Sequence, residues 1–344
     1  MDTRDTPEQA ELRRAARQLA RDLGPATVAA LDDSERAKRL AAAVRDAGWL
    51  ELRDDDGDGA PIASGVEAAI VADALGGAVA DVAFSGPLLA ADLARRAGVP
   101  TTDGGAVVFA ADLCTPAAVT NTPMYAVDIA RGQGGAAYVL IPEDNGFHLA
   151  QMLLDDDPAT TGTDLTRGVR EISPASVAPV PGQQRLLTHD DGAAWMALGL
   201  ALTSADLVGV MRGVLDVTVA YAAGRKQFGV AVGSFQAVQH LLAEAHCLME
   251  GSYSAALHAS WAVDSLAPAD ALAAGRVAKA YCARAARTVC ETAVQVHGGI
   301  GNTWECIVHV YLRRALLSSQ WFGDDREQLR ELQRTRLRVA YGLS

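Results

Sequence analysis

The segment 195–223 constrains the fold of this chain more than any other. It is almost entirely apolar, and its three charged residues are Asp206, Arg212 and Asp216. A helix that is apolar on most sides has to be covered by other helices. Arg212 and Asp216 lie four residues apart, so we expect them to pair on one side of this helix, with Asp206 on a different side. Further helical segments follow with short connections, and the sequence therefore predicts an antiparallel bundle over residues 189–344.

Four later segments carry apolar residues at helical spacing: 235–266, 267–296, 303–319 and 325–339. Ser234 is expected to cap the first of them, and Asn302 or Thr303 the third, because these residue types accept hydrogen bonds from the first free N–H groups of a helix. Glu305 is expected to serve as a partner in the third cap. The charged residues of segment 267–296 are expected on its outside: Arg276, Lys279, Arg284 and Arg287.

The first 103 residues also have helical periodicity, in segments 8–23, 33–47, 66–75 and 87–97. Between the second and third segments, residues 54–59 read D-x-D-x-D-G, which is half of a calcium-binding loop. The acid that such a loop needs at its twelfth position is replaced by Gly65. We therefore interpret this loop as a solvated turn and predict no metal site.

Residues 104–188 have a different pattern. The segments 106–110, 125–129 and 136–141 are short β-type runs, and Asn145-Gly146 is a hairpin turn signal. The predicted fold is mainly α, with an N-terminal helical domain (1–103), a small central β domain (104–188) and a C-terminal antiparallel helical bundle (189–344).

Composition excludes several function classes. The formal net charge of −12 argues against a nucleic-acid partner. The five cysteines form no C-x-x-C pair, as expected of reduced thiols in a cytoplasmic protein. The chain is charged from Asp2 onward, so we expect no signal peptide. The most apolar run, Gly192–Ala205, is interpreted as too short for a membrane span.

Two stretches carry the candidate chemistry. The first, RKQFG, begins at Arg225, and a guanidinium beside a loop can donate two hydrogen bonds to a diphosphate. Phe228 in this stretch offers a flat apolar face. The second stretch is QVHGGIG, in which Gly298 and Gly299 let the backbone approach a ligand closely. The glycines lack the spacing of a Rossmann fingerprint and follow a helical segment.

In their order and spacing these stretches resemble the flavin-binding motifs of the acyl-CoA dehydrogenase family, closely over residues 195–316 and loosely over the first hundred. The resemblance implies FAD as cofactor, an acyl-CoA thioester as substrate and α,β-desaturation as reaction. The cofactor-binding residues that it implies are Arg225, Gln227, Phe228, Gln236, Gln295, Val296, His297, Gly298 and Gly299.

The chain departs from the family pattern where the flavin ring should be covered. The family uses a Thr-Glu-Pro loop and a Trp followed shortly by Thr or Ser. Here Cys114-Thr115-Pro116 lacks the acid, and no Trp occurs between Trp49 and Trp195.

The catalytic carboxylate of the family is also missing. Counting along the chain puts Gly199 and Phe322 at the two positions that hold it. Asp206 shares a helix face with Gly199, about 10 Å away, and is a candidate substitute. The other interpretations are a buried or capped structural Asp and an interface Asp.

Three hypotheses follow. In the first, the chain resembles the short subunits of heteromeric actinobacterial acyl-CoA dehydrogenases that act on steroid or other bulky acyl-CoAs, and it completes the FAD site of a fuller partner chain in an α2β2 assembly. In the second, it is a non-catalytic scaffold. In the third, it is a self-sufficient homo-oligomer that uses Asp206 as base.

Overall fold

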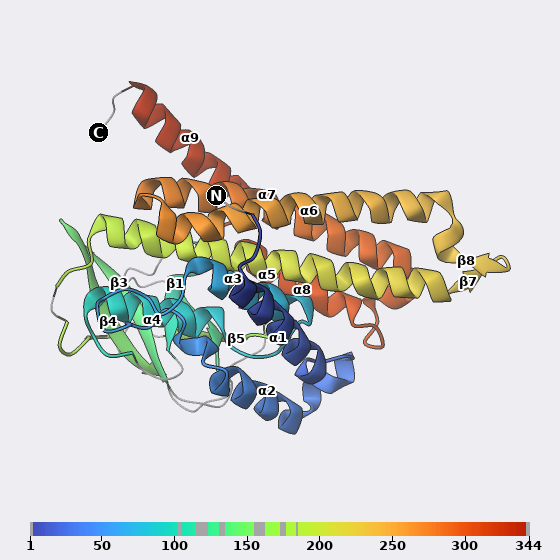
Figure 1. Ribbon diagram of the computed structural model, residues 1–344, viewed down its shortest axis with the longest axis horizontal. Helices are drawn as coiled ribbons and strands as arrows, with labels where there is room; N and C mark the ends of the chain where they lie inside the picture. The colour runs from blue at the N-terminus through green and yellow to red at the C-terminus, as the bar shows by residue number, and fades with distance from the viewer. Residues whose placement is uncertain are drawn as a thin grey trace.

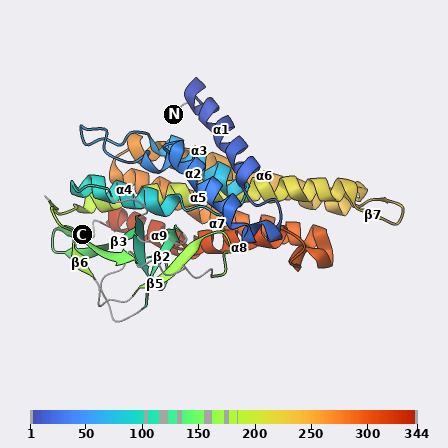
Figure 2. The ribbon, with the colours of Figure 1, turned by 90° about the horizontal axis from the view of Figure 1, so that it is seen from below.

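The computed structural model describes residues 3–101, 105–114, 123–130, 135–154, 162–172, 177–183 and 185–341, and the structural statements below concern these residues. Long helices form a bundle that runs the length of the molecule (Figure 1). A sheet lies at one end of this bundle and a short hairpin projects from the other. Seen from below, the first helix and the sheet lie on opposite sides of the bundle (Figure 2).

The N-terminal helices are α1 (Pro7–Leu23), α2 (Ser34–Asp46), α3 (Gly65–Gly77) and α4 (Ser85–Ala97). Their existence confirms the helical periodicity of this region. Helix α1 begins at a capping box in which Thr6 and Gln9 satisfy each other's backbone N–H groups. The acidic loop is an exposed turn, in which one carboxylate oxygen of Asp55 accepts the N–H groups of Gly57 and Gly59.

The larger sheet of the described residues has six strands in the order β5-β2-β1-β3-β4-β6. They are β1 (Ala106–Ala110), β2 (Met124–Ile129), β3 (Gly135–Glu143), β4 (Gly146–Leu154), β5 (Gly168–Ile172) and β6 (Ala178–Pro179). Strand β1 runs parallel to β3, and the other neighbours are antiparallel. The predicted Asn145-Gly146 turn joins β3 to β4, with Glu143 opposite Gly146. Thr115 and Pro116 lie outside the described residues.

The bundle consists of α5 (His189–Gly224), α6 (Gln236–Ser265), α7 (Pro268–His297) and α8 (Val308–Gln320), followed by α9 (Asp325–Tyr341). The predicted mainly α fold is confirmed. Helix α5 begins several residues before the predicted start, because Thr188 and Asp191 form a capping box there.

Two predicted helix caps are wrong. Helix α8 begins at Val308, because residues 298–302 form a 3₁₀ turn and the hydroxyl of Thr303 donates to the carbonyl of Ile300. Neither Asn302 nor Glu305 caps it. Helix α6 is preceded by Phe235, which has no side-chain cap. The hydroxyl of Ser234 donates to the carbonyl of Ala231 instead.

Two predicted charge placements are also wrong. Arg212 pairs with Asp73 of α3, and not with Asp216, because α3 crosses α5 at this level. Lys279, expected on the outside, is fully buried, and its ammonium group donates to the carbonyls of Ser318 and Trp321. Burial lowers the pKa of Lys279 to about 7.

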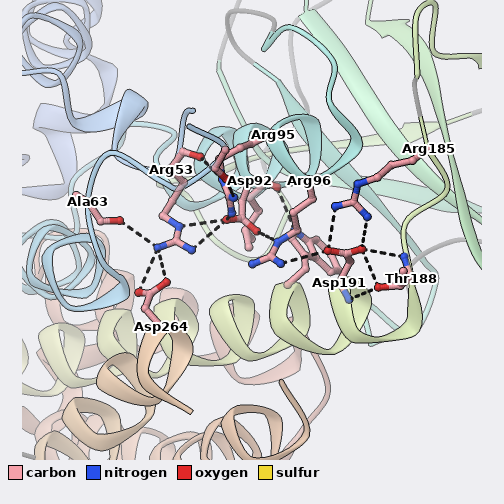
Figure 3. Close-up of polar contacts among 12 residues, drawn as sticks. Arg53, Ala63, Asp92, Arg95, Arg96, Arg185, Thr188, Asp191 and Asp264 are labelled. Carbon is pink, nitrogen blue, oxygen red and sulfur yellow. Dashed lines mark hydrogen bonds and ion pairs between the residues drawn. The ribbon is translucent and has the colours of Figure 1, made fainter. Parts of the chain in front are cut away.

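A buried charge network fixes the N-terminal helices to the bundle (Figure 3). Arg53 is 1% exposed and contacts Asp92 of α4 and Asp264 of α6. Asp92 also accepts from Arg96, which lies 3.7 Å from Asp191 at the start of α5. Because every buried carboxylate here has a guanidinium partner, the network positions α4 against the ends of α5 and α6.

Helix α5 is long and apolar enough, by length and composition, to cross a membrane. The expectation that this region is too short for a span is therefore wrong about its length, since the helix has 36 residues. However, 94% of its most apolar window is buried inside the protein. The helix thus serves as the central helix of the bundle, as its apolar periphery predicts.

Candidate functional site

The RKQFG stretch forms the projecting hairpin at the far end of the bundle (Figure 1). Arg225 ends α5 and is exposed; its backbone carbonyl accepts the N–H of Val232, 2.8 Å away. Strands β7 (Lys226–Gln227) and β8 (Val230–Ala231) then pair. Their turn holds Phe228 at φ 53° and Gly229 at φ 83°, both in the left-handed region.

Phe228 is the most exposed large apolar side chain of the described residues, at 94%. A left-handed backbone is unfavourable for a residue that is not glycine. The hairpin therefore presents this ring to solvent. Among the described residues, its ring neighbour is Phe235, with centroids 6.4 Å apart, so contacts within the chain stabilise this conformation little.

The QVHGGIG stretch ends α7 at the same end of the bundle. The ring of His297 stacks on Tyr221 of α5 with centroids 4.2 Å apart, and this contact joins the two helix ends. Gln295, Gly298 and Gly299 are exposed. A side chain at either glycine would meet no atom within 4 Å, so the backbone here faces open space.

The structure thus brings most of the predicted cofactor residues to one exposed surface, which we call the motif end. Gln236 lies at the exposed start of α6. His297 is different: its ring is 6% exposed, and its Nδ1 lies 2.9 Å from the carbonyl of Ala293. Burial lowers the pKa of His297. The ring therefore packs inside the chain, and only the backbone at this position is available to a ligand.

The motif end fits one half of a flavin dinucleotide. The guanidinium of Arg225 has no hydrogen bond or ion pair among the described residues, so its donors are available for diphosphate oxygens. Phe228 and the open glycines suit a ring and a close backbone approach. The six-stranded sheet β1–β6 lies at the opposite end of the bundle, so it is not placed to cover a flavin ring near Arg225 (Figure 1).

The two positions that the family uses for its base meet in space at the sheet end. A Cβ added at Gly199 would lie 2.1 Å from the ring of Phe322. Phe322 is fully buried, with Phe109 at 5.0 Å and Trp195 at 5.4 Å between ring centroids. With Trp321, these side chains form what we call the aromatic cluster. No carboxylate belongs to it, and the ring of Phe322 fills the space beside Gly199.

Hydrogen bonds hold Phe322 in this position. Its backbone has φ 66°, its N–H donates to the carbonyl of Leu113 at 2.8 Å, and its carbonyl accepts from the amide of Gln328 at 2.6 Å. The backbone is therefore fixed on both sides of the ring.

Asp206 is 1% exposed and lies in a buried charge cluster. Its carboxylate accepts from Arg314 at 2.7 Å, from Arg167 at 2.9 Å and from the hydroxyl of Ser318 at 2.7 Å. Burial by itself raises the pKa of Asp206, but Arg167 and Arg314 together outweigh it and hold the pKa at about 2. A carboxylate that is this acidic and fully paired is a weak proton acceptor.

Sequence analysis missed the residues that surround these sites. They are Tyr221, which lies four residues before Arg225, and Arg167 and Arg314 around Asp206, which lie outside both motifs. The spacing of Tyr221, one turn before Arg225 on the same helix, is the one signal that points to its place.

Comparison with known proteins agrees with this architecture. The family model described as "Acyl-CoA dehydrogenase, C-terminal domain" matches residues 196–337. The acyl-CoA dehydrogenase IpdE2 of Mycobacterium tuberculosis is 30% identical over 339 residues, which cover 95% of this chain and 97% of that protein. IpdE2 of Mycolicibacterium smegmatis is 36% identical over 170 residues, covering 49% of this chain. That match spans half of the length of the smegmatis protein.

Solved structures share the fold over nearly the whole chain. The Tcur3481-Tcur3483 steroid ACAD has a TM-score of 0.77 at 21% identity and covers 97% of this chain and 99% of that one. The ChsE4-ChsE5 complex of Mycobacterium tuberculosis has a TM-score of 0.72 at 21% identity, with 99% of each chain covered. From its motifs, its fold and its full-length relative, this chain belongs to the acyl-CoA dehydrogenase family.

Proposed function

We propose that this chain is a subunit of a FAD-dependent acyl-CoA dehydrogenase and that its motif end completes the FAD site of a catalytic partner chain. The observation that carries the proposal is the separation of two sites on α5. Gly199 and Arg225 are 26 residues apart, which corresponds to about 39 Å along a helix. A dinucleotide held at the motif end cannot also serve the aromatic cluster of the same chain.

The chemistry of the two ends supports the same division of work. FAD bound at the motif end would supply the oxidant for removing hydrogen from an acyl-CoA thioester. Arg225 would donate to its diphosphate, Phe228 would pack against it, and the backbone at Gly298 and Gly299 would approach it closely. At the aromatic cluster, Phe322 occupies the place of a base, so proton removal falls to the partner chain.

The names of the similar structures extend the proposal. Two of them are named as pairs of different chains, one described as a steroid ACAD. We infer an α2β2 assembly with a fuller acyl-CoA dehydrogenase-like chain, in the cytoplasm, acting on a steroid-type or otherwise bulky acyl-CoA. We also keep 1–103, 104–188 and 189–344 as the proposed boundaries of its three units.

The hypothesis of a self-sufficient enzyme that uses Asp206 has less support. Asp206 is enclosed by Arg167, Arg314 and Ser318, and Phe322 lies beside Gly199 in place of a carboxylate. An α,β-desaturation needs a base that reaches the substrate.

The test is flavin content with and without a partner. The chain is expressed alone and together with a fuller family member, and flavin absorbance per chain is measured after purification. We expect little flavin in the isolated chain and stoichiometric flavin in the complex. Near-stoichiometric flavin in the isolated chain contradicts the partner-dependent site. If the complex is stable and its flavin content does not change when residues of the motif end are substituted, the chain is a non-catalytic scaffold.

A further inference from the structure

A cavity that shares no residue with the motif end or the aromatic cluster lies between α1, α3, α5 and α8. Its volume is about 320 Å³, at the lower end of the range for small-molecule sites. Three arginines line it: Arg17 and Arg21 from α1, and Arg212 from α5. We call this cavity the arginine crevice. Nothing in the proposed function uses it.

The arginines of the crevice share their carboxylate partners. Asp73 is 4% exposed and is the shared partner of Arg13, Arg17 and Arg212. Arg13 also pairs with Asp5 at 2.7 Å. One carboxylate, Asp73, therefore remains for the two guanidiniums of Arg17 and Arg212.

The guanidiniums also retain hydrogen-bond donors. A guanidinium has five N–H donors. Among the described residues, Arg17 makes one hydrogen bond, to Asp73, and Arg212 makes one, to the other oxygen of the same carboxylate. Arg21 is exposed and has no hydrogen bond or ion pair among the described residues. These N–H groups can donate to the oxygens of an anion without breaking the contacts to Asp73.

The remaining wall of the crevice is largely apolar. It includes Ala20, Pro25, Val217 and Ile307, while the phenol of Tyr311 is occupied by its hydrogen bond to the carbonyl of Gly77. The lining carries three positive and two negative side chains, Asp216 being the second acid. The local charge is therefore +1, within a chain whose formal net charge is −12.

We propose that the arginine crevice binds a small organic monocarboxylate, with its oxygens at Arg17, Arg21 and Arg212 and its apolar body against Pro25, Val217 and Ile307. The crevice shares no residue with the aromatic cluster, so we place it apart from the site of the acyl substrate. The exposed carboxylate of Asp216 disfavours dianions, because a second negative charge would lie close to it.

The experiment is a calorimetric titration of the full chain with benzoate, and with benzamide as the uncharged molecule of the same shape. We expect saturable benzoate binding that weakens with added salt, and none with benzamide. Arg21→Gln should raise the dissociation constant of benzoate about 5-fold, the size of an exposed charge contact. Asp216→Asn should lower it, because it removes a repulsive charge.

The matched control is Arg14→Gln. Arg14 is also exposed on α1 and does not line the crevice, so this variant changes the net charge equally. We expect its benzoate affinity to equal that of the unaltered chain. The proposal is overturned if benzoate does not saturate by about 10 mM, a concentration well above ordinary weak ligand affinities. It is equally overturned if benzamide binds as well, or if Arg14→Gln has the effect of Arg21→Gln.

Discussion

Asp206 is a candidate base by its position in the sequence, but in the fold it lies in a buried charge cluster. Its carboxylate is shared by Arg167 and Arg314 inside the protein, so its negative charge is used to neutralise them. Removing one partner of a buried ion pair leaves the other charges without compensation.

Asp206→Asn is therefore expected to lower the free energy of unfolding by about 3–5 kcal/mol, the usual range for breaking a buried pair. Turnover of the assembled complex per bound flavin should stay within a few-fold, because loss of a general base costs about 10²–10⁴-fold. Chemical denaturation and a dye-reduction assay measure the two quantities. The control is Asp216→Asn, an exposed position on the same helix. A thousand-fold loss of turnover at full flavin content would make Asp206 the base.

Arg225 has the opposite surroundings: it is exposed, and its guanidinium has no partner in the part of the chain that the structure describes. Arg225→Ala should weaken FAD retention by the assembled complex by about 1.5–3 kcal/mol, the contribution of a hydrogen bond to a charged group. Arg225→Lys should restore only part, since an ammonium cannot donate to two oxygens in the geometry of a guanidinium. Flavin release during dialysis measures both. Arg284→Ala, an exposed arginine on α7, is the control; equal retention in all variants would mean that Arg225 does not contact the cofactor.

At the scale of elements, α5 and the turn after α8 pack against each other at Gly199 and the ring of Phe322. The ring of Phe322 occupies the volume that a side chain at position 199 would need. Both are held by buried neighbours, so neither can move away at low cost.

Gly199→Ala is expected to destabilise the chain by about 1–3 kcal/mol, as overpacking of a filled core does. In a Phe322→Ala background the same change should cost far less, because the added methyl group then lies in the cavity that the ring has left. Denaturant unfolding of the unaltered chain, the two single variants and the double variant gives the coupling. Gly224→Ala serves as control on the same helix, since its added methyl group meets nothing within 4 Å. Additive effects of the two changes would show that the ring and position 199 do not touch.

At the scale of the whole molecule, buried carboxylates paired with arginines join the N-terminal helices, the strand region and the bundle. Burial raises the pKa of Asp191, but its hydrogen bonds with Arg185 and Thr188 bring it to about 2. The pKa of Asp206 is also about 2. Burial raises the pKa of Asp92, but the charges of Arg96, Arg53 and Arg95 outweigh burial and lower this pKa as well.

Because these pKa values are lower in the folded than in the unfolded chain, the carboxylates stabilise the fold at every pH above about 4, their ordinary range. This stabilisation is lost as the pH falls from about 4 towards 2. The buried His297 has a lowered pKa, so it also destabilises the fold as the pH falls below about 6.5, the ordinary pKa of histidine. We therefore expect the urea midpoint to fall slightly between pH 7 and 5 and steeply below 4. Asp206→Asn should make that fall shallower. A midpoint that falls equally in both proteins would assign the acid sensitivity to other groups.

The sequence by itself determined the elements and the family. Periodicity predicted the long helices and the strands β1, β2 and β3, because 3.6-residue and two-residue repeats are local properties of the chain. The two motifs predicted the residues of the motif end, and counting along the chain identified Gly199 and Phe322 as positions without a carboxylate. Helix starts were less accurate, as at Val308, because several nearby residues could cap each helix.

Only the tertiary structure decided which partners these elements meet. Periodicity places a residue on a helix face but does not name what packs against it, so Lys279 was expected in solvent and Arg212 beside Asp216. The contact of Gly199 with Phe322 joins residues 123 positions apart. The separation of the motif end from the aromatic cluster follows from the straight course of α5 (Figure 1). Such facts depend on long-range packing, which no local pattern in the chain encodes.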